Sequence, residues 1–256
     1  MRVELSGLIP AQFEAWTVVF ALAEAFDEGW VVVGGQMIQL HATELGVGQG
    51  VRPTFDIDVL VDIRAHRSGT ERVADWLIEQ GFELEGVNAF GIGHRYWRAA
   101  DPGPGKVIVD VLAPDGVGEN ASRLTSPPAR TVLVPGGTQA LDRAEAVNVV
   151  ARDLAGDRSV EGIARRPSLL GALVTKAAAT AIPGRENPDR DWQDAALLLR
   201  SIPDPFVLVS LLDRKDRDRL RRLRALDDRG HPGWALLGDE DHRRGTTALG
   251  ILLDTK

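Results

Sequence analysis

The chain contains no cysteine among its 256 residues. Without thiols it has no disulfides, no thiolate metal sites and no cysteine nucleophile, so any bound metal would be held mainly by oxygen. It also lacks an excess of positive charge, because 30 lysine and arginine residues face 37 aspartate and glutamate residues and give a net charge of −7. A protein that coats nucleic acid non-specifically needs an overall basic surface, so the composition excludes that class and leaves room only for a local basic patch.

Long apolar runs are missing as well. The most apolar stretch near the N-terminus, from Trp16 to Phe26, is about half as long as a membrane-spanning helix and contains Glu24. The first residues lack the apolar core and cleavage site of a signal peptide. With 44% hydrophobic and 26% charged residues, the composition is that of a packed globular protein. We therefore expect a cytoplasmic protein with no membrane partner.

The hydrophobic patterns predict an α+β fold with a mixed sheet flanked by helices, followed by a helical half. Expected helices of the first half cover 12–28, 36–45 and 71–80, and expected strands cover 30–33, 55–61, 82–85, 92–98, 106–112 and 131–134. The Pro/Gly-rich segment 101–105 predicts a hairpin turn. Beyond about Val160 only helical patterns remain, at 168–181, 191–200, 205–213 and 214–228. We place a boundary near Asp157, between an α/β domain (1–157) and a helical domain (158–256) that share one cleft.

Two carboxylates, Asp56 and Asp58, lie two residues apart in an expected strand. Residues at this spacing point to the same face, so the two carboxylates project side by side. The alternate positions are expected to face the core: Phe55, Ile57 and Val59. Adjacent like charges are costly without a counter-ion, and oxygen ligands with room for phosphate suit Mg²⁺ or Mn²⁺. Asp-x-Asp also occurs by chance on exposed strands, so the pair alone does not identify a metal site.

A third carboxylate, Asp110, interrupts the apolar strand Val107–Leu112, where an acidic residue is out of place unless it is functional or paired. Three carboxylates on neighbouring strands could hold two divalent ions. Such a site stabilises both the attacking and the leaving oxygen of an in-line displacement at phosphorus. The sequence thus predicts Asp56, Asp58 and Asp110 as metal ligands, with Asp110 also helping to deprotonate an acceptor.

A double glycine, Gly34-Gly35, ends the first buried strand and opens the next helix. Backbone N–H groups and a helix N-terminus form an anion site there, and glycine lets a phosphate approach the backbone. Double glycines are common in tight turns. It is the order of strand, glycine turn, helix and paired carboxylates that indicates a nucleotide-binding site.

This order of motifs resembles the AbiEii-like branch of the polymerase-β-type nucleotidyltransferase superfamily, which includes the MenT-type toxins. Val33-Gly34-Gly35-Gln36-Met37 and Arg52-Pro53-Thr54-Phe55-Asp56-Ile57-Asp58 are similar to that branch's Gly-Gly-x-Ala and Arg-x-Thr-x-Asp-Ile-Asp. The long spacing between the two motifs favours this branch over the wider superfamily. The resemblance implies a nucleotidyltransferase-type sheet, an NTP substrate and Mg²⁺ or Mn²⁺.

The resemblance also assigns roles outside the metal strand. Lys176, a lone lysine in an apolar helix, would contact the triphosphate, and Asp191 would orient that lysine or the nucleotide, with Asp194 as a further candidate. Independently of the resemblance, the position of Arg52 and Thr54 at the entrance to the metal strand predicts that they bind nucleotide, because arginine could meet phosphate oxygens there. The alternatives are a snorkelling surface lysine, a helix N-cap for Asp191 and a structural salt bridge for Arg52.

By the same resemblance, the reaction would move a nucleoside monophosphate from an NTP to an acceptor hydroxyl. The acceptor would be the 3′ end of a tRNA, translation would be blocked, and a cognate antitoxin would be a partner. Two alternatives remain open: a nucleotidyltransferase acting on a small molecule or a protein hydroxyl, and a non-catalytic nucleotide-binding module.

Basic residues gather in one segment, Arg214–Arg224, with leucines at helical spacing. The segment could contact an RNA backbone, or it could be a solvated helix face with internal Asp–Arg pairs. The histidines show no metal-ligand spacing and are expected to be structural or exposed: His41, His66, His94, His231 and His242.

Overall fold

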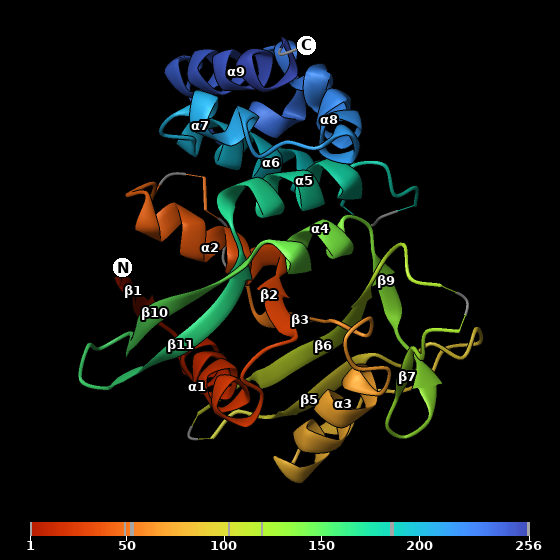
Figure 1. Ribbon diagram of the computed structural model, residues 1–256. Helices are drawn as coiled ribbons and strands as arrows, with labels where there is room; N and C mark the ends of the chain where they lie inside the picture. The colour runs from red at the N-terminus through yellow and green to blue at the C-terminus, as the bar shows by residue number, and fades with distance from the viewer. Residues whose placement is uncertain are drawn as a thin grey trace.

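The computed structural model describes residues 2–48, 50–51, 54–101, 103–118, 120–184 and 187–254. The fold is α+β, as predicted, with two larger sheets and a short two-stranded one in the N-terminal part of the described chain and helices stacked over them in the C-terminal part (Figure 1). Within the described residues, no helix combines the length and apolar character needed to cross a membrane.

The central sheet is mixed. Its strand order is β2-β3-β6-β5-β4, with β9 pairing β6. β3 runs parallel to β6, as does β9, and the other pairs are antiparallel. The bounds are β2 Trp30–Val33, β3 Asp56–Val61, β4 Glu83–Leu84, β5 Arg95–Ala99, β6 Lys106–Pro114 and β9 Val132–Val134. The predicted hairpin is confirmed, since β5 and β6 pair antiparallel with Ala99 opposite Lys106; Pro102 of its turn lies outside the described residues.

The two faces of this sheet differ because side chains alternate along each strand. One face is apolar and packs against helices α1 (Pro10–Ala25) and α3 (Gly69–Glu79). Ile57 and Val59 face this core, as expected, whereas Phe55 is exposed because β3 begins only at Asp56. The opposite face carries the carboxylates.

A second, three-stranded sheet was not predicted. It has the order β1-β10-β11, with bounds β1 Arg2–Leu8, β10 Ala144–Asp153 and β11 Ser159–Pro167. Asp157 lies in the connection between β10 and β11, so the predicted boundary falls within a hairpin. The sheet continues to Pro167, and the helical part begins at Leu169. Charged residues recur along β11, which weakens the hydrophobic alternation that marks a strand.

Two further helices connect the sheets to the helical part. Helix α2 (Gly34–Glu44) contributes Met37, Ile38 and Ala42 to the apolar core of the C-terminal helices. Helix α4 (Gly137–Asp142) packs its Ala140 with Leu60 and Leu112 of the central sheet. A short two-stranded sheet, β7 Leu124–Thr125 with β8 Ala129–Arg130, lies beside α3.

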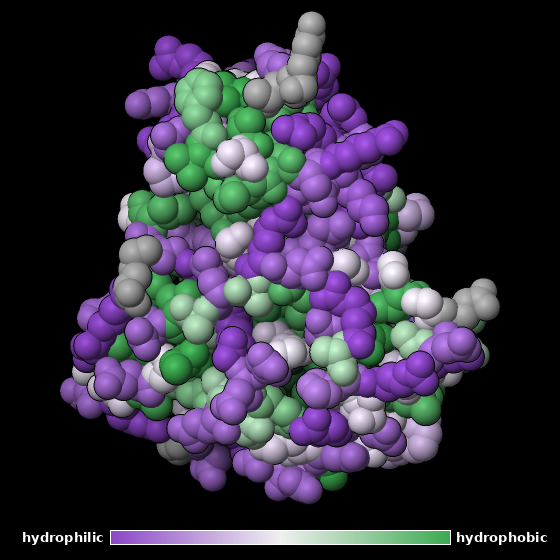
Figure 2. Space-filling model, viewed as in Figure 1, coloured by the Kyte–Doolittle hydropathy of each residue, from purple (hydrophilic) through white to green (hydrophobic). Residues whose placement is uncertain are grey.

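The C-terminal part consists of α5 Leu169–Ala179, α6 Asp189–Ser201, α7 Pro205–Val209, α8 Arg214–Leu220 and α9 Asp239–Asp254, with 3-10 turns at Arg221–Asp227 and Pro232–Trp234. Ser168 caps α5 by accepting a hydrogen bond from the Gly171 N–H. Figure 2 shows an apolar patch around α7 on a face that is otherwise mixed or hydrophilic. Its exposed residues include Phe206, Val207 and Leu211.

Candidate active site

The predicted site residues meet at a pocket of about 240 Å³ between the central sheet and the helical part. Its walls come from the start of α2, from β3, β5 and β6, and from α5 and α6. Six residues singled out in the sequence line it: Gly34, Asp56, Asp58, Asp110, Lys176 and Asp191. Three polar residues that were not assigned to the site also line it: Arg95, Thr175 and Arg190.

Strand register produces this convergence. Asp58 lies opposite Asp110 on the parallel neighbour β6, and Asp110 lies opposite Arg95 on β5. Residues directly opposite one another share a face, with neighbouring strands about 4.8 Å apart. The three side chains therefore form one polar row across the sheet, and Asp56 lies on the same face two residues before Asp58.

Gly34 lies against the Asp58 carboxylate. Its φ is +62°, in the left-handed region, and a β-carbon at this position would lie 2.8 Å from Asp58 Cγ and closer still to Oδ2. Any other residue would meet both backbone strain and a steric clash. The glycine predicted to admit a phosphate thus makes room first for a carboxylate of the site.

Thr54 lies beneath the pocket and does not line it. The residue is buried, and its Oγ1 donates to Asp56 Oδ1 at 3.1 Å. A β-carbon on Gly35 would lie 2.7 Å from Thr54 Cβ and Oγ1, so the second glycine lets Thr54 approach the backbone. Thr54 thus helps to orient Asp56, and the nucleotide contact predicted for Gly35 and Thr54 stays a prediction. Arg52 lies outside the described residues.

Asp110 is held by Arg95. The guanidinium donates from Nε to Asp110 Oδ1 at 2.8 Å and from Nη2 to Asp110 Oδ2 at 2.7 Å, a bidentate pair. Arg95 Nη2 also lies 3.7 Å from Asp56 Oδ2. Each oxygen of Asp110 thus accepts one hydrogen bond and keeps a second lone pair, and the prediction of Asp110 as a metal ligand beside Asp56 and Asp58 stays a prediction. The sequence pattern missed Arg95 because its relation to Asp110 depends on strand register.

Negative charge remains crowded around Asp58. Burial raises the pKa of Asp58 to about 7, and the nearby charges of Asp56 and Asp110 act in the same direction, against Lys176 and Arg190. A carboxylate that resists ionisation beside a second carboxylate is a setting that a cation would relieve. Asp56 and Asp58 supply the oxygen ligands that Mg²⁺ and Mn²⁺ prefer.

Lys176 is a buried ammonium group between two carboxylates of α6. Its Nζ lies 3.1 Å from Asp191 Oδ1 and 2.7 Å from Asp194 Oδ2. Burial alone would lower the pKa of Lys176, but the charges of Asp194 and Asp191 outweigh it and raise that pKa. Lys176 is therefore not a snorkelling surface lysine. The pair with Asp191 has the arrangement expected from the motif order, and Asp194 is a second partner.

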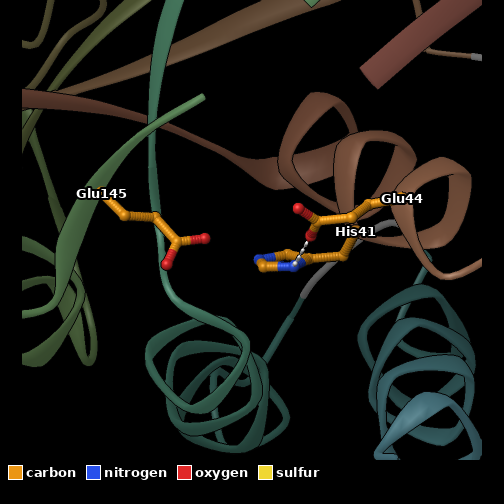
Figure 3. Close-up of side chains that lie close together, drawn as sticks. All are labelled: His41, Glu44 and Glu145. Atoms are coloured by element: carbon orange, nitrogen blue, oxygen red, sulfur yellow. Dashed lines mark ion pairs between the residues drawn. The ribbon is translucent and has the colours of Figure 1, made fainter. Parts of the chain in front are cut away.

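A second cluster of potential metal ligands is more compact than the aspartates of the pocket. Among the described residues, His41, Glu44 and Glu145 form the one group of three potential metal ligands whose atoms all lie within 4.8 Å of one another. Figure 3 shows His41 and Glu44 on α2, with the Glu145 carboxylate facing them from β10. The buried Arg166 already supplies a cation there, since its guanidinium donates to both Glu44 and Glu145.

The state of His41 also indicates an ion-pair network in place of a metal site. Burial lowers the pKa of His41 to about 3, and the Arg166 charge adds to the shift. The neutral ring donates from Nε2 to the Pro167 carbonyl at 3.0 Å. This cluster is a buried ion-pair network that joins α2 to β10 and β11, and its positive charge comes from arginine.

Three of the seven cations in the basic segment 214–224 contact the protein itself. Arg219 pairs with Asp115 at 2.8 Å, Arg217 donates to the Leu212 carbonyl at 3.2 Å, and Arg221 pairs with Asp218. These contacts favour a structural role for three cations of the segment, which are Arg217, Arg219 and Arg221. The others have no side-chain partner within the described residues: Arg214, Lys215, Arg222 and Arg224.

A larger pocket of about 520 Å³ lies at the opposite end of β2 and β3, between α1 and α3. Its polar lining includes Asp27, Glu28, Asp62, His66 and Arg72. The Asp62 carboxylate there is bound by Arg64 at 2.8 Å. No set of side chains in this pocket matches a motif of the sequence, so the smaller pocket is the stronger candidate for catalysis.

Comparison with protein-family models gave no match, and comparison with curated proteins gave none.

Proposed function

We propose that the chain is a metal-dependent nucleotidyltransferase that moves a nucleoside monophosphate from an NTP to the 3′-hydroxyl of an RNA. One observation carries the proposal. The residues of four separate motifs, which are Gly34, Asp56 with Asp58, Asp110, and Lys176 with Asp191, line a single pocket. Motif order alone predicted their convergence.

The metal-binding residues are Asp56 and Asp58. Thr54 and Gly34 position their carboxylates, through the Thr54 Oγ1 hydrogen bond and the space left by the missing side chain. Bound Mg²⁺ or Mn²⁺ would neutralise phosphate charge and stabilise the attacking and leaving oxygens. The metal fits this donor set because both groups are carboxylates on one strand face, facing into a pocket.

Lys176 lines the same pocket, and despite its burial the neighbouring aspartates raise its pKa and so favour its charged form. Asp191 and Asp194 fix its position, so that little reorganisation is needed when a triphosphate enters. Arg190 adds a second cation at the wall of the pocket. We assign both residues to the phosphates of the NTP.

Asp110 serves the acceptor. A carboxylate oxygen has two lone pairs, and Arg95 uses one on each oxygen, so Asp110 can still accept the proton of an attacking hydroxyl. The acceptor oxygen forms a bond to the α-phosphorus as the bond to the bridging oxygen breaks, and pyrophosphate leaves. By resemblance, the RNA is a tRNA, its modification blocks translation, and a cognate antitoxin restrains the enzyme.

Label transfer tests the proposal. The purified protein is incubated with Mg²⁺ and each NTP labelled at the α-phosphate, in separate reactions with total RNA, total protein or hydroxyl-bearing small molecules. We expect label in RNA, reduced at least ~100-fold by Asp56→Ala. The matched control is Asp62→Ala, because Asp62 follows β3 at its other end and pairs with Arg64.

The acceptor arms separate the alternatives. Label in protein or in a small molecule, with none in RNA, overturns the proposal that RNA is the acceptor. Absence of label in every arm overturns the nucleotidyltransferase and favours a non-catalytic nucleotide-binding module.

A further inference from the structure

A pocket of about 450 Å³, called the second pocket below, adjoins the candidate active site. It is distinct from the larger pocket between α1 and α3. Arg95 lines both pockets, so its guanidinium stands between them while it holds Asp110. Glu85 lies next to Arg95, because its N–H donates to the Arg95 carbonyl at 2.8 Å. Glu85 thus extends the row of polar residues beyond Arg95. A ligand in this second pocket would therefore lie next to the carboxylate assigned to the acceptor.

A hydrogen-bonded turn forms one wall of this pocket. Asn88 Oδ1 accepts from the N–H groups of Phe90 at 2.9 Å and Ile92 at 3.1 Å, and the Asn88 N–H donates to the Ile92 carbonyl at 2.9 Å. These bonds fix the orientation of the Asn88 amide. Asn88 lines the pocket, and within the described residues nothing accepts a hydrogen bond from its Nδ2 group.

The lining combines apolar and polar side chains. Val87 and Ile92 are aliphatic, whereas the other side chains carry hydrogen-bonding groups: Glu85, Asn88, His94 and Arg95. Aliphatic surface suits the faces of a flat ring, and donors and acceptors suit its edges. A nucleobase has this combination of properties.

The surroundings fit a nucleic-acid chain leaving the pocket. Phe90, on the same turn, is 84% exposed, although it is a large apolar residue. The exposed Arg130 is bonded to this turn through its backbone, which donates to the Gly91 carbonyl at 2.7 Å and accepts from Gly93 N–H at 2.9 Å. Among the described residues, no carboxylate forms an ion pair with Arg130. Exposed aromatic rings and arginines bind single strands by stacking and by contact with phosphates.

We propose that the second pocket binds the base of the acceptor's 3′-terminal nucleotide, and that Phe90 and Arg130 contact the nucleotides before it. The inference rests on the proposed function and names the part of the site that selects RNA. It places the terminal ribose beside Arg95 and Asp110, so Arg95 is a positioning residue that separates the acceptor from the NTP.

The pocket can be filled without touching the catalytic carboxylates. Val87 is 52% exposed, and Val207 on α7, remote from the site in sequence and fold, is 59% exposed. We expect Val87→Trp to weaken binding of a short single-stranded RNA with a free 3′-hydroxyl about tenfold, measured by fluorescence anisotropy, and Val207→Trp to leave it unchanged. Both variants should bind Mg²⁺-NTP as wild type does.

A second pair of variants tests the stacking residue. Phe90→Ala should weaken RNA binding about tenfold, whereas Phe206→Ala, at a 70% exposed phenylalanine on α7, should not. Unchanged RNA affinity in both Val87→Trp and Phe90→Ala, or no binding of single-stranded RNA by the wild type, overturns the inference. If RNA affinity falls as expected but the wild type transfers no label, the inference survives and the proposed chemistry fails.

Discussion

A β-carbon on Gly34 would lie 2.8 Å from Cγ of Asp58 and closer still to its Oδ2. The Asp58 carboxylate on β3 thus occupies space that only a glycine at the start of α2 leaves open. Its positive φ of +62° adds a second requirement. These two constraints tie a backbone turn directly to the candidate metal ligand.

Gly34→Ala should reduce nucleotidyl transfer at least ~100-fold, because the new methyl group displaces the Asp58 carboxylate. The backbone conformation alone costs about 1–2 kcal/mol for a residue with a side chain. The matched control is Gly46→Ala, since Gly46 has a φ of +68° but no atom within 4 Å of the position that a methyl group would take. We expect the control to lose similar stability and to keep its activity. Equal activity losses in the two variants would contradict the role assigned to Gly34.

Asp58 should make the metal-free protein less stable as pH rises. The folded-state pKa is raised from 3.8 to about 7, mainly by burial, so the folded state binds more protons than the unfolded state between these values. Stability from this group is fully present below about pH 4 and is lost as pH rises to about 7. In EDTA, Asp58→Asn should therefore be more stable than wild type at pH 8, by about 4 kcal/mol, and should lose this advantage near pH 4. Denaturant unfolding at both pH values measures the difference, and parallel pH profiles would refute the assignment.

Lys176 should have separable structural and catalytic roles. Lys176→Met removes a buried cation that pairs with both Asp191 and Asp194, which should cost about 3–5 kcal/mol of unfolding free energy. Adding Asp191→Asn and Asp194→Asn to this variant should recover much of the stability, because the two buried negative charges that Lys176 offsets are then removed as well. Activity should not recover if Lys176 binds the triphosphate. Activity that returns together with stability would show that the lysine is only structural.

Arg166 should be the cation of the His41 cluster. Arg166→Met leaves Glu44 and Glu145 without their shared partner, and we expect a loss of about 3–5 kcal/mol in unfolding free energy. Added Zn²⁺ or Mn²⁺ should leave the melting temperature of the Asp56→Ala/Asp58→Ala protein unchanged, since arginine already fills the cluster. A metal-dependent rise in that protein, abolished by His41→Ala, would instead identify a metal site.

The sequence predicted the central sheet and its carboxylates because their signals are local. An apolar strand, a glycine stop and a two-residue spacing suffice to place Asp56 and Asp58 on one face. The pairing of Asp110 with Arg95 could not be predicted in this way, since it depends on which residues of two strands lie opposite each other.

The second sheet escaped prediction for a related reason. Strand β11 carries Glu161, Arg165 and Arg166, so its apolar alternation is weak, and its pairing with β10 gives it its conformation. Thr54 shows the limit for single residues: its motif position did not reveal the hydrogen bond that its hydroxyl donates to Asp56, and the predicted nucleotide contact stays a prediction.

The most direct test of nucleotidyl transfer compares two labels on the same NTP. Wild-type protein is incubated with Mg²⁺, RNA and an NTP labelled at either the α- or the γ-phosphate. We expect that the α-label enters RNA while the γ-label is released as pyrophosphate, and that Asp56→Ala does neither. Transfer of the γ-label to RNA, or pyrophosphate release without label in any acceptor, would contradict nucleotidyl transfer.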